Sequence, residues 1–540
     1  MTEASELWRV SGVVRELGEH PDEVLARAAA ACGIGVESVR SFRVVKRSID
    51  ARGRRAPRFQ HIVELELPHG ALTEPPAGNV RRAPVADVEL PRAVAHDSAR
   101  PIVIGLGPCG IFAALRLALA GLRPIVLDRG KPVETWAKDV ARLMGKGEIN
   151  PDSNLCYGEG GAGTWSDGKL YTRVGGPHLR TVLETIVAHG GPERILVDAR
   201  PHLGTDRLVK LLKSLRATLT DLGAELRFSS RVERLCIEDG RVIGVDLEDG
   251  STISGTHVVL APGHSARRLY RSLAESRVTM TQVPFSVGFR IEHPQALVNE
   301  VQYGAWAGHE ELPPAYYELK SRTGDKDVYS FCMCPGGSVV PTPTNDGEVC
   351  VNGMSHAARS GRYANSAVVV SVTPSEYQGF SEGEDEASVL LAGASYQLAS
   401  EREAWRLGGG AFVAPAQRLV DFLAGKPSSD VRRTTYKRGV TAGDLSTCYP
   451  AEVTERLREG MRGFERRFPG WVTEDAVAIG VETRTSSPVR IDRDRSSLES
   501  VNVAGLYPSG EGAGYGGGIV SAAIDGIKVA DAILTSVGAE

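Results

Sequence analysis

The 540-residue sequence has no uninterrupted apolar run long enough to cross a membrane. The best candidate, Ile111 to Leu122, is broken by Arg116. The opening residues, MTEASELWRV, lack the basic and then apolar pattern of a secretion signal. The eight cysteines are mostly isolated and do not have the spacing of a disulfide framework. We therefore expect a cytoplasmic protein without a membrane span.

Charge and length restrict the remaining classes of protein. The formal net charge is −4, so the chain has no general electrostatic attraction to nucleic acid. With 540 residues and 42% hydrophobic side chains, it is long enough for two or three domains with a sizeable core. We expect a multi-domain protein whose partner is a small molecule and not a nucleic acid.

Residues 1–95 predict a small α+β module of β-α-β-β order, which we expect to be ferredoxin-like. LWRVSGVV alternates like a strand, HPDEVLARAAAACGI has helical spacing, and SFRVVKRSI and RFQHIVELEL are typical of two further strands. A Pro- and Ala-rich stretch, from about Pro68 to Arg100, is predicted to be a linker. Two explanations stay open for the basic turn of the module, a solvated hairpin or a docking site for an acidic partner; its residues are Lys46, Arg47, Arg52, Arg54, Arg55 and Arg58.

The rest of the chain predicts an α/β fold with an inserted domain. PIVIGLGPCGIFAALRLALAGLRPIVLDRG is typical of a Rossmann-like unit: a buried strand, a glycine turn, a helix and a second buried strand. We assign residues 96–282 to the first part of this dinucleotide-binding domain. Residues 283–474 mix strands with long loops and predict a mixed β-sheet substrate domain. Residues 475–540 are predicted to return to the first domain and supply its last strand and helix.

The glycine turn has the spacing GxGxxG. Gly105 makes a tight turn, Gly107 lets a pyrophosphate approach the backbone, and Gly110 lets the helix pack against the strand. Asp128 ends the next strand, where a carboxylate accepts hydrogen bonds from a ribose. The same two segments add the candidate cofactor-binding residues Pro108, Cys109 and Arg129. The pattern predicts a dinucleotide site.

Two later segments indicate that the dinucleotide is FAD. THVVLAPGHSAR resembles the second flavin fingerprint of the glutathione-reductase-like flavoproteins, in which a strand ends in a tight turn; here the turn is Ala261, Pro262 and Gly263, and the proline departs from the usual pattern. In VNVAGLYPSGEGAGYGGGIV, an apolar strand ends at an acid and a helix follows the glycines. The candidate cofactor-binding residues of this segment are Gly510, Glu511, Gly517, Gly518 and Ile519.

Glu511 occupies the place where that superfamily usually has an aspartate that binds the flavin ribitol or pyrophosphate. The helix that begins near Gly518 is expected to aim its free N–H groups at the flavin ring. Its positive end then stabilises the negative charge that develops on the reduced ring. Three fingerprints in this order predict FAD as the cofactor.

Longer motifs resemble one family along nearly the whole chain. RGKPVETWAKDV, INPDSNLCYGEGGAGTWSDGKLYTR, YSFCMCPGGSVV, VNGMSHAARSGRYANSA and GVETRTSSPVRI are similar to the largely uncharacterised bacterial FAD-dependent dehydrogenases. The resemblance implies that the loop GEGGAGTWSDGKL wraps the flavin. Its candidate contact residues are Gly160, Gly161, Gly163 and Thr164.

The chemistry expected on the flavin follows from two motifs that the sequence does not contain. Outside the flavin fingerprints, no second strand–GxGxxG–helix unit follows the first domain, and no C-x-x-C follows it either, so a disulfide-reductase mechanism is disfavoured. One FAD domain with one substrate domain predicts an oxidoreductase that transfers a hydride between an organic substrate and non-covalent FAD. Two alternatives stay open: a flavin monooxygenase that uses O₂ and NAD(P)H, and a non-catalytic flavin-binding redox protein. NAD(P)H as a transient electron donor also stays open.

Cys332 and Cys334 in VYSFCMCPGG are the first catalytic candidates. In a regular strand both thiols leave from one face, opposite Phe331 and Met333, with Cα atoms roughly 6.6 Å apart. That spacing lies at the edge of disulfide geometry. Buried structural cysteines and a redox or nucleophilic pair are both compatible with the pattern.

Arg484 and His293 are two further catalytic candidates. Arg484 in GVETRTSSPVR stands shortly before the last flavin strand and is expected either to fix an anionic substrate or to form a structural pair with a glutamate. His293 in GFRIEHPQ is expected either to donate a proton or to be a buried structural histidine. We predict no metal site.

Overall fold

Short apolar strands form the central sheet of the computed structural model, which describes residues 4–53, 55–76, 78–84 and 100–538. The sheet is five-stranded and parallel, in the order β23-β11-β5-β6-β7. Its strands are β5 (Ile102–Ile104), β6 (Ile125–Leu127), β7 (Glu225–Arg227), β11 (Val258–Leu260) and β23 (Leu506–Pro508). Strands β5, β6, β11 and β23 are buried throughout, as expected where both faces of a parallel sheet are covered.

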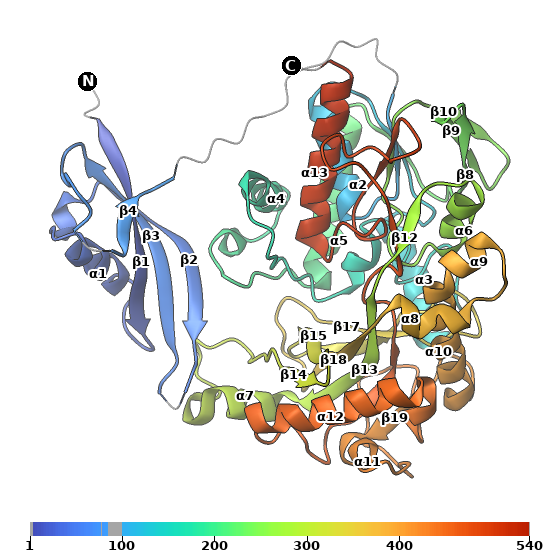
Figure 1. Cartoon of the computed structure of the whole chain (residues 1–540). Helices are drawn as coiled ribbons and strands as arrows, with labels where there is room; N and C mark the ends of the chain where they lie inside the picture. Colours follow the sequence, from blue (N-terminus) through green and yellow to red (C-terminus); the bar gives the residue numbers. More distant parts are fainter. Residues whose placement is uncertain (1–3, 54, 77, 85–99, 539–540) are drawn as a thin grey trace.

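Different elements cover the two faces of the parallel sheet. One face packs against the helices α2 (Pro108–Leu119), α5 (Thr205–Asp221) and α13 (Ile519–Ser536), and Figure 1 shows α2 beside α13. The other face packs against helix α6 (Arg267–Glu275) and an antiparallel sheet of β8 (Val232–Glu238), β9 (Arg241–Leu247) and β10 (Thr252–Ser254). Helices α3 (Val133–Lys146) and α4 (Pro177–Ala188) lie between the parallel strands in sequence. No helix in these described parts of the chain is long and apolar enough to cross a membrane.

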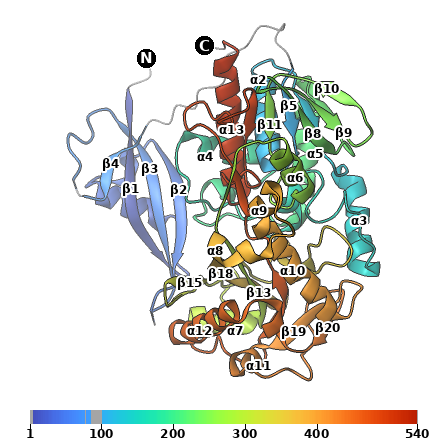
Figure 2. The ribbon, with the colours of Figure 1, turned by 45° about the vertical axis from the view of Figure 1, so that its right-hand side comes forward.

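The inserted unit is built on a seven-stranded sheet of the order β14-β15-β18-β13-β21-β19-β20. Its strands are β13 (Phe285–Pro294), β14 (Lys320–Thr323), β15 (Lys326–Cys334), β18 (Tyr363–Val372), β19 (Ala414–Arg418), β20 (Val440–Ala442) and β21 (Val477–Glu482). The principal helices of the unit are α7 (Gln295–Tyr303), α10 (Ala392–Gly408), α11 (Leu419–Ala424) and α12 (Ala451–Arg467), and Figure 2 shows α7, α11 and α12 at the lower end of the molecule. Its smaller elements are α8 (Pro374–Tyr377), α9 (Glu386–Leu390) and the ribbon of β16 (Ser338–Pro341) and β17 (Val351–Met354).

The position of β21 corrects the predicted boundary at residue 475. This strand pairs with β13 on one side and with β19 on the other, so it lies inside the seven-stranded sheet. The chain crosses between the two units in an antiparallel ribbon of β12 (Met280–Gln282) and β22 (Val489–Ile491). The inserted unit therefore ends after Glu482.

The N-terminal module is a four-stranded antiparallel sheet of the order β2-β3-β1-β4, packed against helix α1 (Glu23–Ala31). Its strands are β1 (Ser5–Glu16), β2 (Ser41–Asp50), β3 (Arg58–Pro68) and β4 (Val80–Arg82). The β-α-β-β order agrees with the sequence, but β4 lies within the stretch predicted to be linker. Residues 85–99 of that stretch, and Arg54 of the basic turn, fall outside the described residues.

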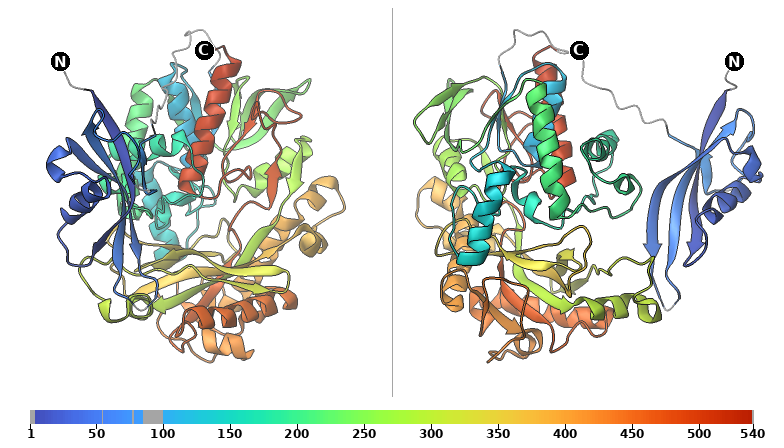
Figure 3. Two further views of the ribbon diagram at one scale, coloured as in Figure 1. Left: turned by 60° about the vertical axis from the view of Figure 1, so that its left-hand side comes forward. Right: turned by 180° about the vertical axis from the view of Figure 1, so that it is seen from behind.

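The module contacts the rest of the chain through β2 and through Arg15 of β1, which pairs with Glu311 at 2.6 Å (Figures 1 and 3). The Arg47 N–H donates to the Val197 carbonyl, and the Ala199 N–H donates to the Arg47 carbonyl, each at 2.8 Å. The Arg47 guanidinium also pairs with Asp198 at 2.7 Å. Arg47, one of the basic residues predicted for this turn, therefore links the N-terminal module to residues 197–199.

Candidate functional site

A large cavity lies where the parallel sheet faces the inserted unit. Its volume is about 2020 Å³. Gly105, Asp128, Ala261 and Ser509 follow the carboxyl ends of β5, β6, β11 and β23, and all four line the cavity. Ligands of open α/β sheets bind at this edge. The loop after α3, strand β15 and part of the N-terminal module complete the wall.

The first glycine turn has the geometry that its spacing predicts. Gly105 has a φ of +93°, and a Cβ atom there would lie 2.2 Å from the Ala261 carbonyl oxygen. A Cβ on Gly110 would lie 1.8 Å from the Gly105 carbonyl oxygen, so this glycine allows α2 to pack against β5 and does not line the cavity. Gly107 precedes the first residue of α2, Pro108, and no side chain caps the helix. The N-terminus of α2 is thus open toward the cavity.

Asp128 braces this turn from the next strand. Its carboxylate accepts hydrogen bonds from the Leu106 and Gly130 N–H groups, each at 2.8 Å. Burial raises the pKa of the Asp128 carboxyl, and the two N–H donors oppose that effect. Arg129 also lines the cavity, although its guanidinium pairs with Asp152. Asp128 therefore holds the glycine turn in shape. It also lies at the position where we expect a ribose to bind.

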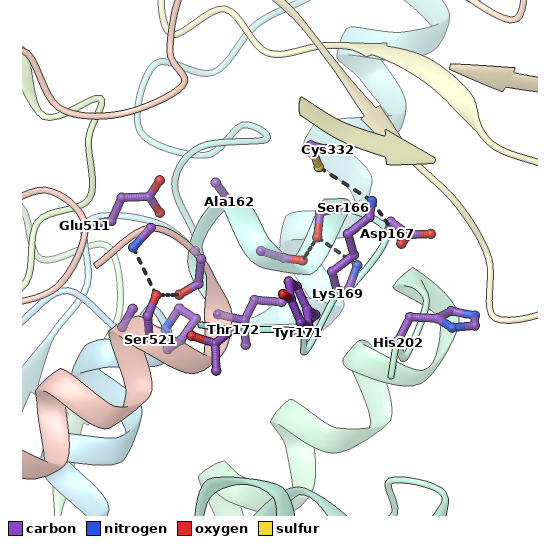
Figure 4. A pocket seen from close by; sticks show the side chains of 18 of the residues that line it. Ala162, Ser166, Asp167, Lys169, Tyr171, Thr172, His202, Cys332, Glu511 and Ser521 are labelled. Carbon is purple, nitrogen blue, oxygen red and sulfur yellow. Dashed lines mark hydrogen bonds and ion pairs between the residues drawn. The ribbon is translucent and has the colours of Figure 1, made fainter. Parts of the chain in front are cut away.

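The segment before α13 leaves open space in the cavity. Gly517 and Gly518 line it, and a Cβ atom on either would meet no atom within 4 Å. No side chain caps α13, whose first residue is Ile519. Burial, together with the charge of Cys332, raises the pKa of the Glu511 carboxyl to about 7. Among the described residues, the structure gives this carboxyl no hydrogen-bond partner, and Figure 4 shows it beside the cavity.

The loop of residues 158–168 closes over the first glycine turn. A Cβ on Gly161 would lie 3.2 Å from the Gly107 Cα, and a Cβ on Gly163 would lie 3.1 Å from the Ile519 side chain. Gly160 and Thr164 do not line the cavity but fix the loop from behind: the Gly160 N–H donates to the Leu106 carbonyl at 2.7 Å, and the Thr164 hydroxyl donates to the Glu159 carbonyl at 3.1 Å.

These features fit a dinucleotide that carries a flat ring. Two uncapped helix N-termini offer N–H donors to phosphate and to an electron-rich ring. Glycines stand where side chains would fill the space, and the Glu511 carboxyl has no hydrogen-bond partner in the part of the chain that the structure describes. Cys109, Gly263 and Gly510 line the same space.

Comparison with known proteins gives the family. Residues 284–485 match the family described as FAD-dependent protein, C-terminal domain-like, and residues 15–66 match a domain of unknown function. An uncharacterised protein of Clostridium beijerinckii is 40% identical over 505 residues, which are 92% of this chain and 93% of the relative. The chain belongs to this family of FAD-dependent proteins. Its cofactor is FAD.

More distant similarities cover part of the chain or are weak. A thiamine thiazole synthase of Methanococcus maripaludis is 24% identical over 194 residues, which are 34% of this chain and 63% of the synthase. A solved halogenase, PltM in complex with phloroglucinol and FAD, aligns over 81% of this chain and 70% of its own, with 12% identity and a TM-score of 0.36. The family assignment rests on the clostridial relative and the C-terminal domain.

The structure brings Cys332 to the cavity of this FAD-dependent protein, with Cys334 behind it. Cys332 lines the cavity, whereas Cys334 is fully buried. The strand is not regular, because Phe331 pairs with Ala367 and Cys334 pairs with Asn365, which leaves one extra residue on β15. Cys332 has a φ of +48° within this bulge. The two thiols do converge, but through the bulge and not through the regular alternation that we expected.

Arg484 is held in a buried ion network at the edge of the cavity. Its guanidinium pairs with Glu401 at 2.6 Å and with Glu348 at 3.0 Å. Arg267 pairs with the same Glu401 at 3.0 Å. The structural pair that the sequence left open is therefore present, and it occupies most of the donors of Arg484.

His293 lies in the core of the inserted unit and does not line the cavity. Its Nε2–H donates to the Trp471 carbonyl at 2.7 Å, and its ring contacts Tyr317 edge-on. Burial lowers the pKa of His293 to about 4. The structure does not place it to donate a proton to a ligand in the cavity.

Sequence reasoning missed the charged residues that surround Cys332. Lys169 Nζ lies 3.7 Å from the Sγ atoms of both Cys332 and Cys334, and 3.1 Å from the Asp167 carboxylate (Figure 4). Asp167 is also paired with Arg359. Lys169 and Asp167 belong to the loop GEGGAGTWSDGKL, so the only signal in the sequence was the position of that loop beside the flavin.

Proposed function

We propose that this FAD-dependent protein is an oxidoreductase that transfers a hydride between an organic substrate and non-covalently bound FAD. One observation carries the proposal: the flavin cradle at Glu511 and Gly517 opens into the same cavity as the wall of β15. At about 2020 Å³ the cavity exceeds the roughly 300–1,000 Å³ of an ordinary ligand pocket, which leaves room for a second molecule beside the cofactor.

Bound FAD supplies the hydride chemistry, and the residues of this chain supply orientation and protons. The N-terminus of α13 stabilises negative charge on the reduced ring. The cavity lining includes the aromatic rings of Tyr171, Tyr316 and Phe331, and the Arg200 guanidinium lies over the two tyrosine rings. Glu482 lines the cavity as well; burial raises its pKa to about 7, against the opposing effect of the Arg290 guanidinium with which it is paired.

Four narrower proposals concern the FAD domain, the N-terminal module, the cellular compartment and the electron donor. We infer a Rossmann-like FAD domain of the glutathione-reductase-like kind, supported by GxGxxG between β5 and α2 and by the sheet order. We infer that the N-terminal module is ferredoxin-like, supported by the strand order β4-β1-β3-β2 with α1 after β1. All eight cysteines are free, which favours a reducing compartment such as the cytoplasm. We propose NAD(P)H as a transient electron donor.

The test is an anaerobic titration of the purified yellow protein, followed at the flavin absorption band. NADPH and NADH are added first, and then a panel of amines, alcohols and 2-hydroxy acids is added to fresh oxidised protein. Bleaching by an organic donor, slowed when the transferred hydrogen is deuterium, supports the proposal. Turnover only with NAD(P)H and O₂, with ¹⁸O from O₂ in the product, would establish the monooxygenase alternative instead.

A further inference from the structure

The wall around Cys332 carries more positive than negative side-chain charge. Its cations are Lys169, Arg290 and Arg359, and its carboxylates are Asp167 and Glu482. Asp167 is shared by Lys169 and Arg359, whereas Arg290 pairs with Glu482 at 2.7 Å. Within the described part of this wall the cations outnumber the carboxylates by one, and the Lys169 ammonium lies 3.7 Å from two sulfur atoms. This arrangement favours a thiolate on the cavity wall.

The backbone of Cys332 is held in a conformation that non-glycine residues rarely adopt. Its φ of +48° falls in the left-handed region, which costs energy for a residue with a side chain. The fully buried Arg290 donates a hydrogen bond to the Cys332 carbonyl oxygen at 2.9 Å. The same guanidinium is fixed by Glu482 and Asn352. Strain of this kind, held by a buried cation, is characteristic of functional positions.

Cys334 is placed as the partner of Cys332. Its thiol lies 3.3 Å from the Cys332 carbonyl oxygen, and its sulfur is as close to Lys169 as that of Cys332. A hydrogen bond from Cys334, together with the charges of Lys169 and Arg290, lowers the pKa of Cys332 well below its ordinary value. The same hydrogen bond and burial raise the pKa of Cys334 well above its ordinary value. The position of Lys169 and these two shifts favour a thiolate at Cys332 beside a protonated thiol at Cys334.

We propose that Cys332 and Cys334 form a redox-active dithiol that exchanges two electrons with the bound FAD. A sulfur–sulfur bond forms between the Cys332 thiolate and Cys334, the Cys334 S–H bond breaks, and two electrons and that one proton pass to FAD. The reverse step opens the disulfide and regenerates one thiolate and one thiol. Cys332 and Glu511 line the same cavity, and the charge of Cys332 acts on the Glu511 carboxyl, so the sulfur shares the space in which we expect the flavin. The inference depends on bound FAD and not on the organic substrate of the proposed function.

The first test counts electrons. The holoprotein is oxidised with ferricyanide, desalted and titrated anaerobically with dithionite, with the flavin band as the readout. Wild-type protein is expected to take four electrons per FAD, and Cys332→Ser and Cys334→Ser are expected to take two. Cys236→Ser is the matched control, because Cys236 is a partly exposed thiol on β8 outside the cavity, and it should still take four. Two electrons in the wild type would overturn the proposal.

The second test measures the reactivity of Cys332. Reduced holoprotein is alkylated with iodoacetamide between pH 5.5 and 9, and each cysteine peptide is quantified by mass spectrometry. Cys332 is expected to react at pH 6.5, well below the pH at which Cys236 reacts. Lys169→Met removes the neighbouring cation and should slow alkylation of Cys332 at pH 6.5 by about tenfold or more, a pKa increase of at least about one unit. Equal pH profiles for Cys332 and Cys236 would contradict a stabilised thiolate. Neither test requires a substrate, so failure of the dithiol is distinguishable from failure of the proposed function.

Discussion

The guanidinium of Arg484 donates hydrogen bonds to both carboxylate oxygens of Glu401, at 2.9 and 2.6 Å, and both side chains are buried. Burial alone would raise the pKa of the Glu401 carboxyl, but the charges of Arg267 and Arg484 outweigh it and lower the pKa to about 2. This pair joins α10 to the segment that follows β21. Arg484 therefore acts first as a support for the wall of the cavity.

Replacement of Arg484 by methionine is expected to destabilise the fold. The change leaves Glu401 with Arg267 as its remaining cation, and breaking a buried pair by removing one partner costs about 3–5 kcal/mol. Urea unfolding measures the loss. The double variant Arg484→Met with Glu401→Met should recover part of it. A single variant with the wild-type unfolding midpoint would show that the network does not support the fold.

Replacement of Gly517 by valine is expected to exclude FAD without unfolding the protein. The new side chain would enter open space in the cavity, where the flavin is expected to lie. The ratio of FAD to protein after purification should fall at least about tenfold, with the unfolding free energy of FAD-free protein within about 0.5 kcal/mol of wild type. Gly443→Val is the matched control: its Cβ also meets no atom within 4 Å, but Gly443 does not line the cavity. Equal FAD content in the two variants would place the flavin elsewhere.

His293 is expected to make the stability of the protein depend on pH. Its folded pKa of about 4 is below the 6.5 of an exposed histidine, because burial disfavours the charged ring. The stabilisation is present above pH 6.5 and is lost as the pH falls toward 4, by about 3 kcal/mol in all. His293→Gln should reduce the slope of unfolding free energy against pH in this window. Substitution of the exposed His20 by glutamine serves as the control, and an unchanged slope in His293→Gln would refute the assignment.

Local patterns in the sequence predicted the parts of the site that depend on residues close together in the chain. The turn at Gly105 and the acid at Asp128 lie where the spacing of strand, glycines and helix put them, because one strand–turn–helix unit fixes that geometry. The polar run around His293 suggested a catalytic group, but β13 is buried on both faces and the histidine is enclosed in the core. The sequence pattern of one strand does not reveal whether one face or both faces of its sheet will be buried.

The features that depend on pairing between distant strands could not be predicted. The bulge at Cys332 results from the register between β15 and β18, which a single strand sequence does not contain. The approach of Lys169 to Cys332 joins residues that are 163 positions apart in the chain. The boundary after Glu482 follows from the pairing of β21 with β13, again a tertiary contact.

The most direct test of the account is a crystal structure of the FAD-loaded protein. We predict that the flavin ring lies against Gly517 and Gly518 at the N-terminus of α13, with Cys332 and Lys169 on the opposite wall of the same cavity. The pyrophosphate should lie at Gly107, where α2 begins. A flavin ring bound outside this cavity, or turned so that protein atoms separate it from Cys332, would contradict both the proposed function and the redox-active dithiol.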